Sequence, residues 1–449
     1  MENTIEKKGI NRDILKIAIP AIFESLFTTF ISIINSKMVA KIDVTAMSAI
    51  AVTNQPRLVV LALFFAVNTA VSAMVAQAFG KKDKVKANQV LITGLVASII
   101  GSLVLGLLCV LLAKPIMEIC SGQPDTMAQS ITYFRIMMGG LVFNIIFMVV
   151  NAALRGCGKT NVTFTSNVIA CVVNVLVNFL IIEGRFGFPA LGVAGAAIST
   201  VLGNLAASVF SVGVSLKETS FVNLKYCIKE KIQATKEVVV EMLGIWKNLA
   251  LENVMLRVGM LISSSIGARI GSYEMSIYSV GINLINVSFA FGNGFQAATI
   301  ALVGRSKGEG NTDKIISYTK RILYLGLISS VVLAIIFAFG SAQFYGFFNK
   351  DPEFIRLGTQ VAILIVPIIP IQVIRIICAG FLQGLYKTQY TMIAGIAANT
   401  IGQPIFSFLF INVLKLKLWG LWTSVLCAQL LWFFITFYYY RKTMKELQS

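Results

Sequence analysis

The chain has 449 residues, of which 57% are hydrophobic and only 13% are charged, and its formal charge is +18. Because soluble domains carry about 25% charged residues, this composition excludes a water-soluble globular protein and indicates a multi-pass membrane protein. The basic residues lie in short loops between apolar stretches, so the charge indicates membrane topology and no nucleic-acid partner. The chain has no histidine, and its 7 cysteines form no CxxC motif. We therefore expect no enzyme activity, no metal site and no cofactor.

Twelve apolar stretches are each long enough to cross about 30 Å of hydrocarbon as a helix. In chain order they are 14–40, 46–78, 88–112, 127–152, 161–182, 193–216, 242–268, 274–303, 316–342, 357–381, 390–412 and 419–440. They lack the alternation of polar and apolar residues that a membrane β-barrel requires. The sequence therefore predicts an all-α polytopic membrane protein with twelve transmembrane helices.

The first stretch contains Pro20 and, deep inside it, Glu24. A charged residue near the centre of a membrane helix costs about 3 kcal/mol, so its presence indicates a specific role. The same pattern returns 228 positions later, where Glu252 corresponds to Glu24. The register continues to pairs further along: Gly80 and Gly308, Lys159 and Lys387, and, at an offset reduced to 225, Ser199 and Ser424. The second half of the chain is thus a repeat of the first half.

The repeat predicts two pseudo-symmetric six-helix lobes, residues 1–216 and 242–449. Between them, residues 217–241 form the longest polar stretch, which we interpret as a cytoplasmic, partly helical linker. Each half has an even number of spans, so both halves start on the same side of the membrane and are related by an axis along its normal. A central cavity is expected where the two lobes meet.

Basic residues are concentrated in the loops on the side of the N-terminus, as at Lys81, Arg155 and Lys217. By the positive-inside rule, both termini are expected in the cytoplasm and the protein in the plasma membrane. We expect it to work as a monomer, with the lipid bilayer and a small-molecule substrate as its partners.

Of the 20 acidic residues, Glu24 and Glu252 are the two that lie clearly within predicted spans. Both follow the cytoplasmic start of their span by about ten residues, or about 15 Å, which is too deep to reach the membrane surface easily. Acidic residues inside a membrane typically mark the path of an ion or a substrate. We predict that these two carboxyls couple transport to an ion, and we favour H⁺ because Na⁺ would require several further oxygen ligands.

Polar residues elsewhere in the spans have two interpretations, as hydrogen bonds between helices or as the lining of a cavity. Asn35 lies on the same face of its helix as Glu24, and Asn174 and Asn178 share one face with Asn167. The same two interpretations apply to Asn68, Asn283, Asn286 and Gln296. All of these except Asn167 are candidate cavity residues.

Two arginines inside spans complete the candidate set. Arg257 is in the middle of its span, and Arg375 lies one turn from Gln372 on a shared face. Each arginine requires a partner on another helix or a water-filled cavity. Because these cations accompany only two glutamates, neutral, zwitterionic or anionic substrates are expected to compete with organic cations.

Several motifs together resemble those of the multidrug and toxic compound extrusion (MATE) family. They are LRGCGKT at 154–160, FGFPALGVAGAA at 186–197, LALEN at 249–253 and GRSKGEGN at 304–311. The resemblance implies a secondary antiporter that exports drugs or metabolites in exchange for Na⁺ or H⁺ through a cavity between two six-helix lobes. It also implies that Glu252 corresponds to a glutamate of span 7 in the family and Glu24 to one in span 1 of some relatives.

The chain departs from the family at two positions. Many relatives have an aspartate late in span 1 and another in span 10, where this chain has Asn35 and Gln372. Coupling has then either moved to Glu24 and Glu252 or works differently or more weakly. The leading expectation is an exporter of small amphipathic organic compounds. The alternative is a flippase of a lipid-linked precursor, whose pyrophosphate Arg257 and Arg375 would hold.

Overall fold

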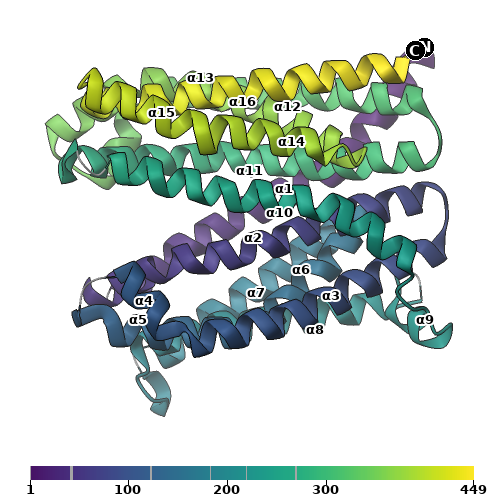
Figure 1. Cartoon of the computed structure of the whole chain (residues 1–449), viewed down its shortest axis with the longest axis horizontal. Coiled ribbons are helices and arrows are strands. Elements are labelled where there is room, and N and C mark those ends of the chain that lie inside the picture. Colours follow the sequence, from purple (N-terminus) through teal and green to yellow (C-terminus); the bar gives the residue numbers. More distant parts are fainter. Residues whose placement is uncertain are drawn as a thin grey trace. The chain divides into compact units, whose positions relative to one another are not determined.

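The computed structural model describes the backbone of residues 2–40, 44–121, 124–182, 184–218, 220–267 and 270–448. Side chains are described in these ranges except at 2–8, 30–40, 44–48, 121, 124–125 and 185. The described backbone is helical and contains no strand (Figure 1). The helices of the first half are α1 (Glu2–Ala40), α2 (Val44–Gly80), α3 (Lys84–Leu111), α4 (Ala113–Ser121), α5 (Pro124–Gly139), α6 (Leu141–Gly156), α7 (Thr160–Ile181), the short η1 (Arg185–Gly187) and α8 (Gly192–Ser215).

The second half follows the same order after the short helix α9 (Leu224–Lys229). Its helices are α10 (Lys236–Gly267), α11 (Ser272–Gly308), α12 (Thr312–Phe348), α13 (Pro352–Gly384), α14 (Thr388–Gly395), η3 (Ile396–Gly402), α15 (Gln403–Ser407), η4 (Phe408–Val413) and α16 (Lys417–Gln448). The segments η3 and η4 are π-helical, so the span from Thr388 to Val413 is interrupted twice. Its counterpart in the first half, α7, is a regular α-helix.

Ten helices of the described residues are long and apolar enough to cross a membrane, and the pair α5 and α6, bent by 45°, makes an eleventh when taken as one span. The bend falls between Gly139 and Leu141, inside the predicted fourth span. With α1, which carries the first predicted span, this arrangement fits the predicted set of twelve.

The chain divides into two compact units, and each is described by itself. Unit 1 comprises residues 1–22 and 247–449, and unit 2 comprises residues 23–246. The division falls inside α1, two residues after Pro20, and inside α10 after Trp246. A proline inside a helix removes one backbone hydrogen bond and weakens the helix locally, which suits a point where the helix passes from one unit to the other. The predicted lobe boundaries at 216 and 242 stay a prediction.

In unit 2, α6 packs against α2, α3 and α8. Close backbone approaches at glycines permit the packing of α6 on α2 and of α8 on α7. A Cβ atom added at Gly156 would lie 2.6 Å from the backbone oxygen of Ser72, and one at Gly203 would lie 2.5 Å from that of Ala170. Small residues at helix contacts are typical of membrane proteins, because lipid tails provide no hydrophobic drive for helix association.

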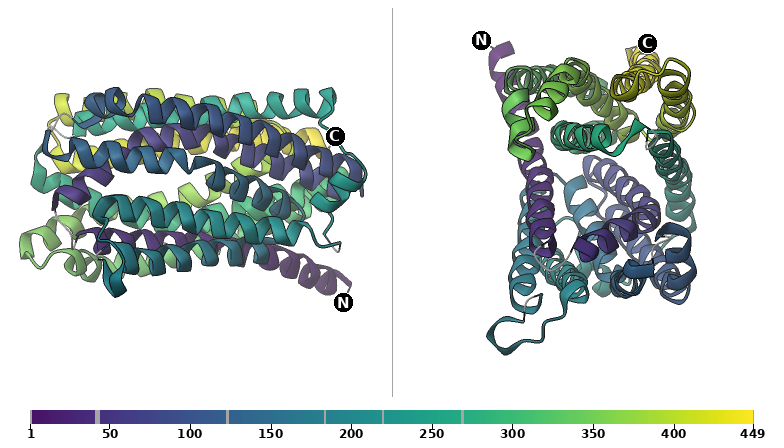
Figure 2. Two further views of the ribbon diagram at one scale, coloured as in Figure 1. Left: turned by 90° about the horizontal axis from the view of Figure 1, so that it is seen from below. Right: turned by 90° about the vertical axis from the view of Figure 1, so that its left-hand side faces the viewer.

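In unit 1, α13 contacts α11, α12 and α16, and these long helices run alongside one another (Figure 2). Tyr345, Ile365 and Trp422 are fully buried within one cluster of this unit. The first turns of α1 and the last turns of α16 lie at the same end of unit 1 (Figure 1).

The predicted linker is partly helical, because α9 lies within it. It is also anchored to unit 2 by the buried amide of Asn88 on α3. Asn88 Oδ1 accepts a hydrogen bond from the backbone N–H of Asn223 at 2.7 Å, and its Nδ2 donates to the backbone oxygen of Phe221 at 3.1 Å. The segment is therefore held to the helices at its start.

Candidate functional site

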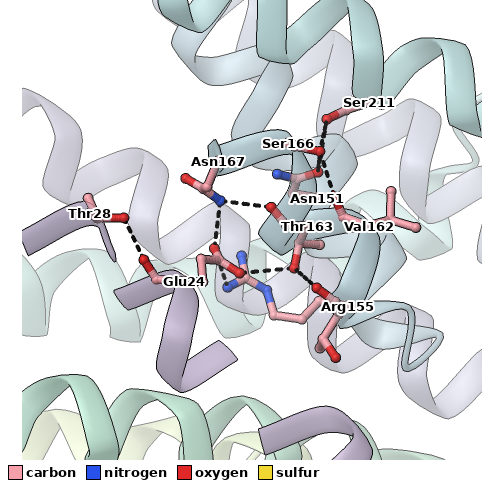
Figure 3. Close-up of polar contacts among 10 residues, drawn as sticks. Glu24, Thr28, Asn151, Arg155, Val162, Thr163, Ser166, Asn167 and Ser211 are labelled. Carbon is pink, nitrogen blue, oxygen red and sulfur yellow. Dashed lines mark hydrogen bonds and ion pairs between the residues drawn. The ribbon is translucent and has the colours of Figure 1, made fainter. Parts of the chain in front are cut away.

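Glu24, on α1, is surrounded by hydrogen-bond donors from α6 and α7 (Figure 3). Thr163 Oγ1 lies 2.9 Å from Glu24 Oε2, and Asn167 Nδ2 donates to Oε1 at 2.9 Å. Arg155 Nη1 lies 3.7 Å from the same Oε1, with side-chain exposures of 21% for Arg155 and 14% for Glu24. Both oxygens of this carboxylate are therefore engaged, and a cation stands beside it.

A second polar cluster fixes the helices that carry these donors. Ser211 on α8 lies 3.0 Å from Oδ1 of Asn151 on α6 and 2.9 Å from Oγ of Ser166 on α7. All three side chains are buried. In Figure 3 this cluster lies beside Thr163 and Asn167, the residues of α7 that contact Glu24. Because buried polar groups keep their hydrogen-bond partners, this cluster fixes the positions of α6, α7 and α8 relative to one another.

Glu252, on α10, lies in a corresponding place in unit 1 and is only 8% exposed. Its Oε2 lies 2.9 Å from Oγ1 of Thr391 on α14. A Cβ atom added at Gly395 would lie 3.1 Å from Cγ of Glu252 and 3.2 Å from its Oε1. Gly395 therefore supplies the space in which this carboxyl group fits.

Each glutamate has a threonine partner, and the two threonines occupy equivalent positions in the two repeats. Thr163 and Thr391 are related by the same offset of 228 residues as Glu24 and Glu252. Thr163 Oγ1 also lies 2.8 Å from the backbone oxygen of Thr160, and Thr391 Oγ1 lies 2.9 Å from that of Thr388. A hydroxyl has a single proton, so it donates either to the carbonyl or to the glutamate.

This geometry lets each threonine respond to a proton on its glutamate. An ionised glutamate accepts the threonine proton, whereas a protonated glutamate can donate to the threonine oxygen and leave the threonine to bond the carbonyl. Both forms are then hydrogen-bonded, which is the property required of a group that takes up and releases a proton inside a membrane.

The sites differ in their remaining partners. The position of Asn167 is occupied by Gly395 in the second repeat, and the position of Arg155 by Gln383. Gln383 Oε1 accepts a hydrogen bond from Gln296 Nε2 at 3.0 Å instead of contacting the glutamate. Glu24 is thus an ion-paired carboxylate, whereas Glu252 has one neutral hydrogen-bond partner in the described part of the chain.

A sequence profile described as MatE matches residues 20–180 and 249–409, which together make up most of the chain. The chain belongs to the MATE family. The first matched segment contains Glu24 near its start, and the second contains Glu252 near its start. The resemblance seen in the sequence motifs is thereby confirmed, and this MATE protein is a membrane transporter and not an enzyme.

Curated relatives of this MATE protein are similar over nearly their whole length. "Probable multidrug resistance protein NorM" of Thermotoga maritima is 23% identical, with 94% of this chain and 90% of the relative covered. "Multidrug export protein MepA" of Staphylococcus saprophyticus is 22% identical, with 94% and 92% covered. "Uncharacterized transporter YisQ" of Bacillus subtilis is 23% identical, with 91% and 90% covered.

Solved structures confirm the fold of the MATE transporter. A MATE in complex with MaL6 superposes with a TM-score of 0.90 at 17% identity, covering 98% of this chain and 97% of the other. An outward-facing multidrug resistance MATE family transporter of the MOP superfamily gives a TM-score of 0.88 at 17% identity and the same coverage. The predicted all-α fold with twelve helices in two lobes is confirmed.

The predicted asparagines of α7 make hydrogen bonds within unit 2. Asn174 Nδ2 donates to Thr200 Oγ1 on α8 at 3.1 Å, and Asn178 Nδ2 donates to Asn174 Oδ1 at 3.3 Å. The first contact favours hydrogen bonding between helices for Asn174, whereas the second lies within α7. Asn167, in the same stripe, bonds Glu24 instead.

The other predicted site residues are spread over several helices. Asn68, on α2, is half-buried, whereas Asn283 and Asn286, on α11, are exposed. Arg257, on α10, is half-buried, and its Nη1 lies 3.9 Å from Sδ of Met260. The side chain of Asn35 lies outside the described residues.

Gln372 and Arg375 are buried on α13 of this MATE transporter. Ser288 Oγ lies 3.2 Å from Gln372 Oε1, and the guanidinium carbon of Arg375 lies 3.5 Å from the ring centroid of Trp432 on α16. Arg375 is close enough to Glu252 for their charges to interact, although no ion pair is seen between these two described side chains.

Sequence reasoning missed three partners of the glutamates: Thr163, Thr391 and Arg155. The two threonines carried a usable signal, because they obey the repeat offset. Arg155 had been assigned to a cytoplasmic loop, whereas it lies in the last turn of α6 and its side chain reaches Glu24.

Proposed function

We propose that the protein exports small amphipathic organic compounds across the cytoplasmic membrane by alternating access, in exchange for H⁺ or Na⁺. The names of two relatives, a multidrug resistance protein and a multidrug export protein, support the substrate class. The observation that carries the coupling is the buried Glu252, whose carboxyl group has, among the described residues, one threonine partner and no ion-paired cation. A proton can occupy this carboxyl without displacing a salt bridge.

The surroundings of Glu24 support a different role for it. Its oxygens face the amide N–H of Asn167 and the guanidinium of Arg155, and both would repel a bound Na⁺. Na⁺ also requires several oxygen ligands. We therefore propose H⁺ as the coupling ion, with Glu252 as the main proton carrier and Glu24 as an ion-paired carboxylate that helps to order α1 against α6 and α7.

In the proposed cycle, a proton from outside neutralises Glu252 and substrate leaves outward. Loss of that proton to the cytoplasm restores the form that binds substrate. Both termini are placed in the cytoplasm by the positive-inside rule, and a monomer with no nucleic-acid partner suffices for this cycle.

The test is uptake of an amphipathic cationic dye by proteoliposomes under an imposed pH gradient or an imposed Na⁺ gradient. We expect the pH gradient to drive transport and Glu252→Gln to abolish it, with the variant still eluting as a folded protein. The matched control is Glu118→Gln, because Glu118 is an exposed acid on α4. A requirement for Na⁺ at fixed pH would reverse the choice of ion.

The alternative, a flippase of a lipid-linked precursor, is examined in the same vesicles with a fluorescent lipid in place of the dye. Arg257 and Arg375 have separate neighbours, Met260 and Trp432. A pyrophosphate site formed by both arginines therefore has no support among these contacts. Movement of lipid without movement of dye would favour the flippase.

A further inference from the structure

Arg375 is a buried cation with unused hydrogen-bonding capacity. Arg375 is only 3% exposed, and neither its Nε nor its Nη2 has a hydrogen-bond partner among the described residues. A buried donor without an acceptor destabilises the folded protein, and a charged donor does so more strongly. Such a group is therefore expected to bind something that the protein itself does not provide.

The two unused nitrogens are adjacent. Nε and Nη2 form one edge of the planar guanidinium, and their N–H bonds point in the same direction within its plane. This edge matches the two oxygens of a carboxylate, which can accept both N–H groups at once. Trp432 covers the face of the same group, with 3.5 Å between the guanidinium carbon and the ring centroid. Stacking thus fixes the plane of the guanidinium without using either of these two N–H groups.

The neighbouring Gln372 adds a polar group on the same side of α13, one turn away. It is fully buried, and its amide makes one contact, with Ser288 Oγ. Whichever way the amide is turned, one of its two polar atoms is left without a partner. Arg375 and Gln372 therefore present unsatisfied polar groups together.

This arrangement is specific to the second repeat. At the corresponding positions of the first repeat, Phe147 replaces Arg375 and Ala207 replaces Trp432. The first repeat has neither the cation nor the aromatic ring that orients it. The first repeat folds without an equivalent of Arg375 and Trp432. The fold therefore does not require these two residues, which points to a function of their own.

We propose that the Nε–Nη2 edge of Arg375 is a binding site for an anionic group, and that it prefers a planar carboxylate. The group comes either from an organic carboxylate substrate or from a small inorganic anion. Glu252 is the nearby carboxyl whose negative charge competes for Arg375. Anion binding is therefore expected to strengthen when that charge is removed.

The experiment uses the purified full-length protein in lipid nanodiscs, without any ion gradient, so that its outcome is independent of the coupling mechanism. Tryptophan fluorescence and the melting temperature are followed during titration with sodium acetate, sodium benzoate or sodium chloride, while methanesulfonate keeps the ionic strength constant. We expect a saturable response to the two carboxylates. A response to chloride of equal strength would assign the edge to an inorganic anion instead of an organic carboxylate.

Variants test whether Arg375 is the residue that binds the carboxylate. Arg375→Gln is expected to raise the half-saturating carboxylate concentration at least about tenfold, and Arg375→Lys, which keeps the charge but loses the two-pronged edge, to raise it less. Trp432→Phe should remove the fluorescence change while retaining the thermal shift. Glu252→Gln should lower the half-saturating concentration. Arg135→Gln is the matched control, because Arg135 is an exposed arginine on α5 that belongs to no candidate site.

Two results would overturn the proposal. One is a titration curve for Arg375→Gln and Arg375→Lys that coincides with that of the unmodified protein. The other is an equal loss of response in Arg135→Gln, which would indicate a general effect of positive charge. If Arg375→Gln does not fold, the Lys variant and the Glu252→Gln variant still decide the matter.

Discussion

The hydroxyl of Thr391 lies 2.9 Å from Oε2 of Glu252 and 2.9 Å from the backbone oxygen of Thr388, in the first turn of α14. It is therefore the one described hydrogen-bond partner of this carboxyl. The matching hydroxyl of Thr163 shares its site with Asn167 and Arg155, so Glu24 depends on its threonine less than Glu252 does.

Thr391→Val should reduce proton-driven dye transport about tenfold, since a hydrogen bond to a charged group contributes about 1.5–3 kcal/mol. Valine keeps the shape of the side chain but has no hydroxyl, and Thr391→Ser should restore most of the activity. The matched variant Thr163→Val should have a smaller effect. Transport rates measured across a range of pH provide the readout. Equal losses in the two valine variants would contradict the proposed difference between the sites.

Arg155→Gln should destabilise the protein by about 1–3 kcal/mol, because it removes one partner of a largely buried carboxylate. The effect should be visible as a lower melting temperature in detergent. Adding Glu24→Gln to this variant should recover part of the loss, since no unpaired charge is then buried. A double variant whose loss equals the sum of the two single losses would show that the pair does not interact.

Gly395→Ala should impair transport more than folding. The new Cβ would press on Glu252 at 3.1–3.2 Å and displace its carboxyl from Thr391. Gly340→Ala on α12 is the control, since a Cβ there meets nothing within 4 Å. Alanine also favours a helix over glycine by about 1 kcal/mol, so the control should be at least as stable as the parent protein. We expect the proton-driven rate to fall in Gly395→Ala alone.

Asn88→Ala should loosen the segment between α8 and α10. The amide of Asn88 bonds both Asn223 and Phe221, and its loss leaves buried backbone groups unsatisfied at a cost of about 1–3 kcal/mol. Limited proteolysis should then cut near Lys229 or Lys231 faster than in the parent protein, while transport of dye is retained. Asn161→Ala, which changes an exposed asparagine on α7, should leave the cleavage rate unchanged.

The sequence alone determined the number and order of the membrane helices, because a helix must be continuously apolar to cross lipid and this requirement is local. The repeat offset and the two glutamates were equally visible, since a charged residue within an apolar stretch stands out. The structure and the family match confirm the fold, and they leave the role of Glu24 and Glu252 as a proposal.

Only the tertiary structure decided which residues meet the two carboxyls. Thr163 and Thr391 are each separated from their glutamate by 139 residues along the chain. Hydrophobic periodicity does not specify which helices become neighbours or how each is rotated, because lipid and protein present similar apolar surroundings to a membrane helix. For the same reason, the sequence left open the role of Asn174. Its hydrogen bond to Thr200 became visible only once α7 and α8 were packed together.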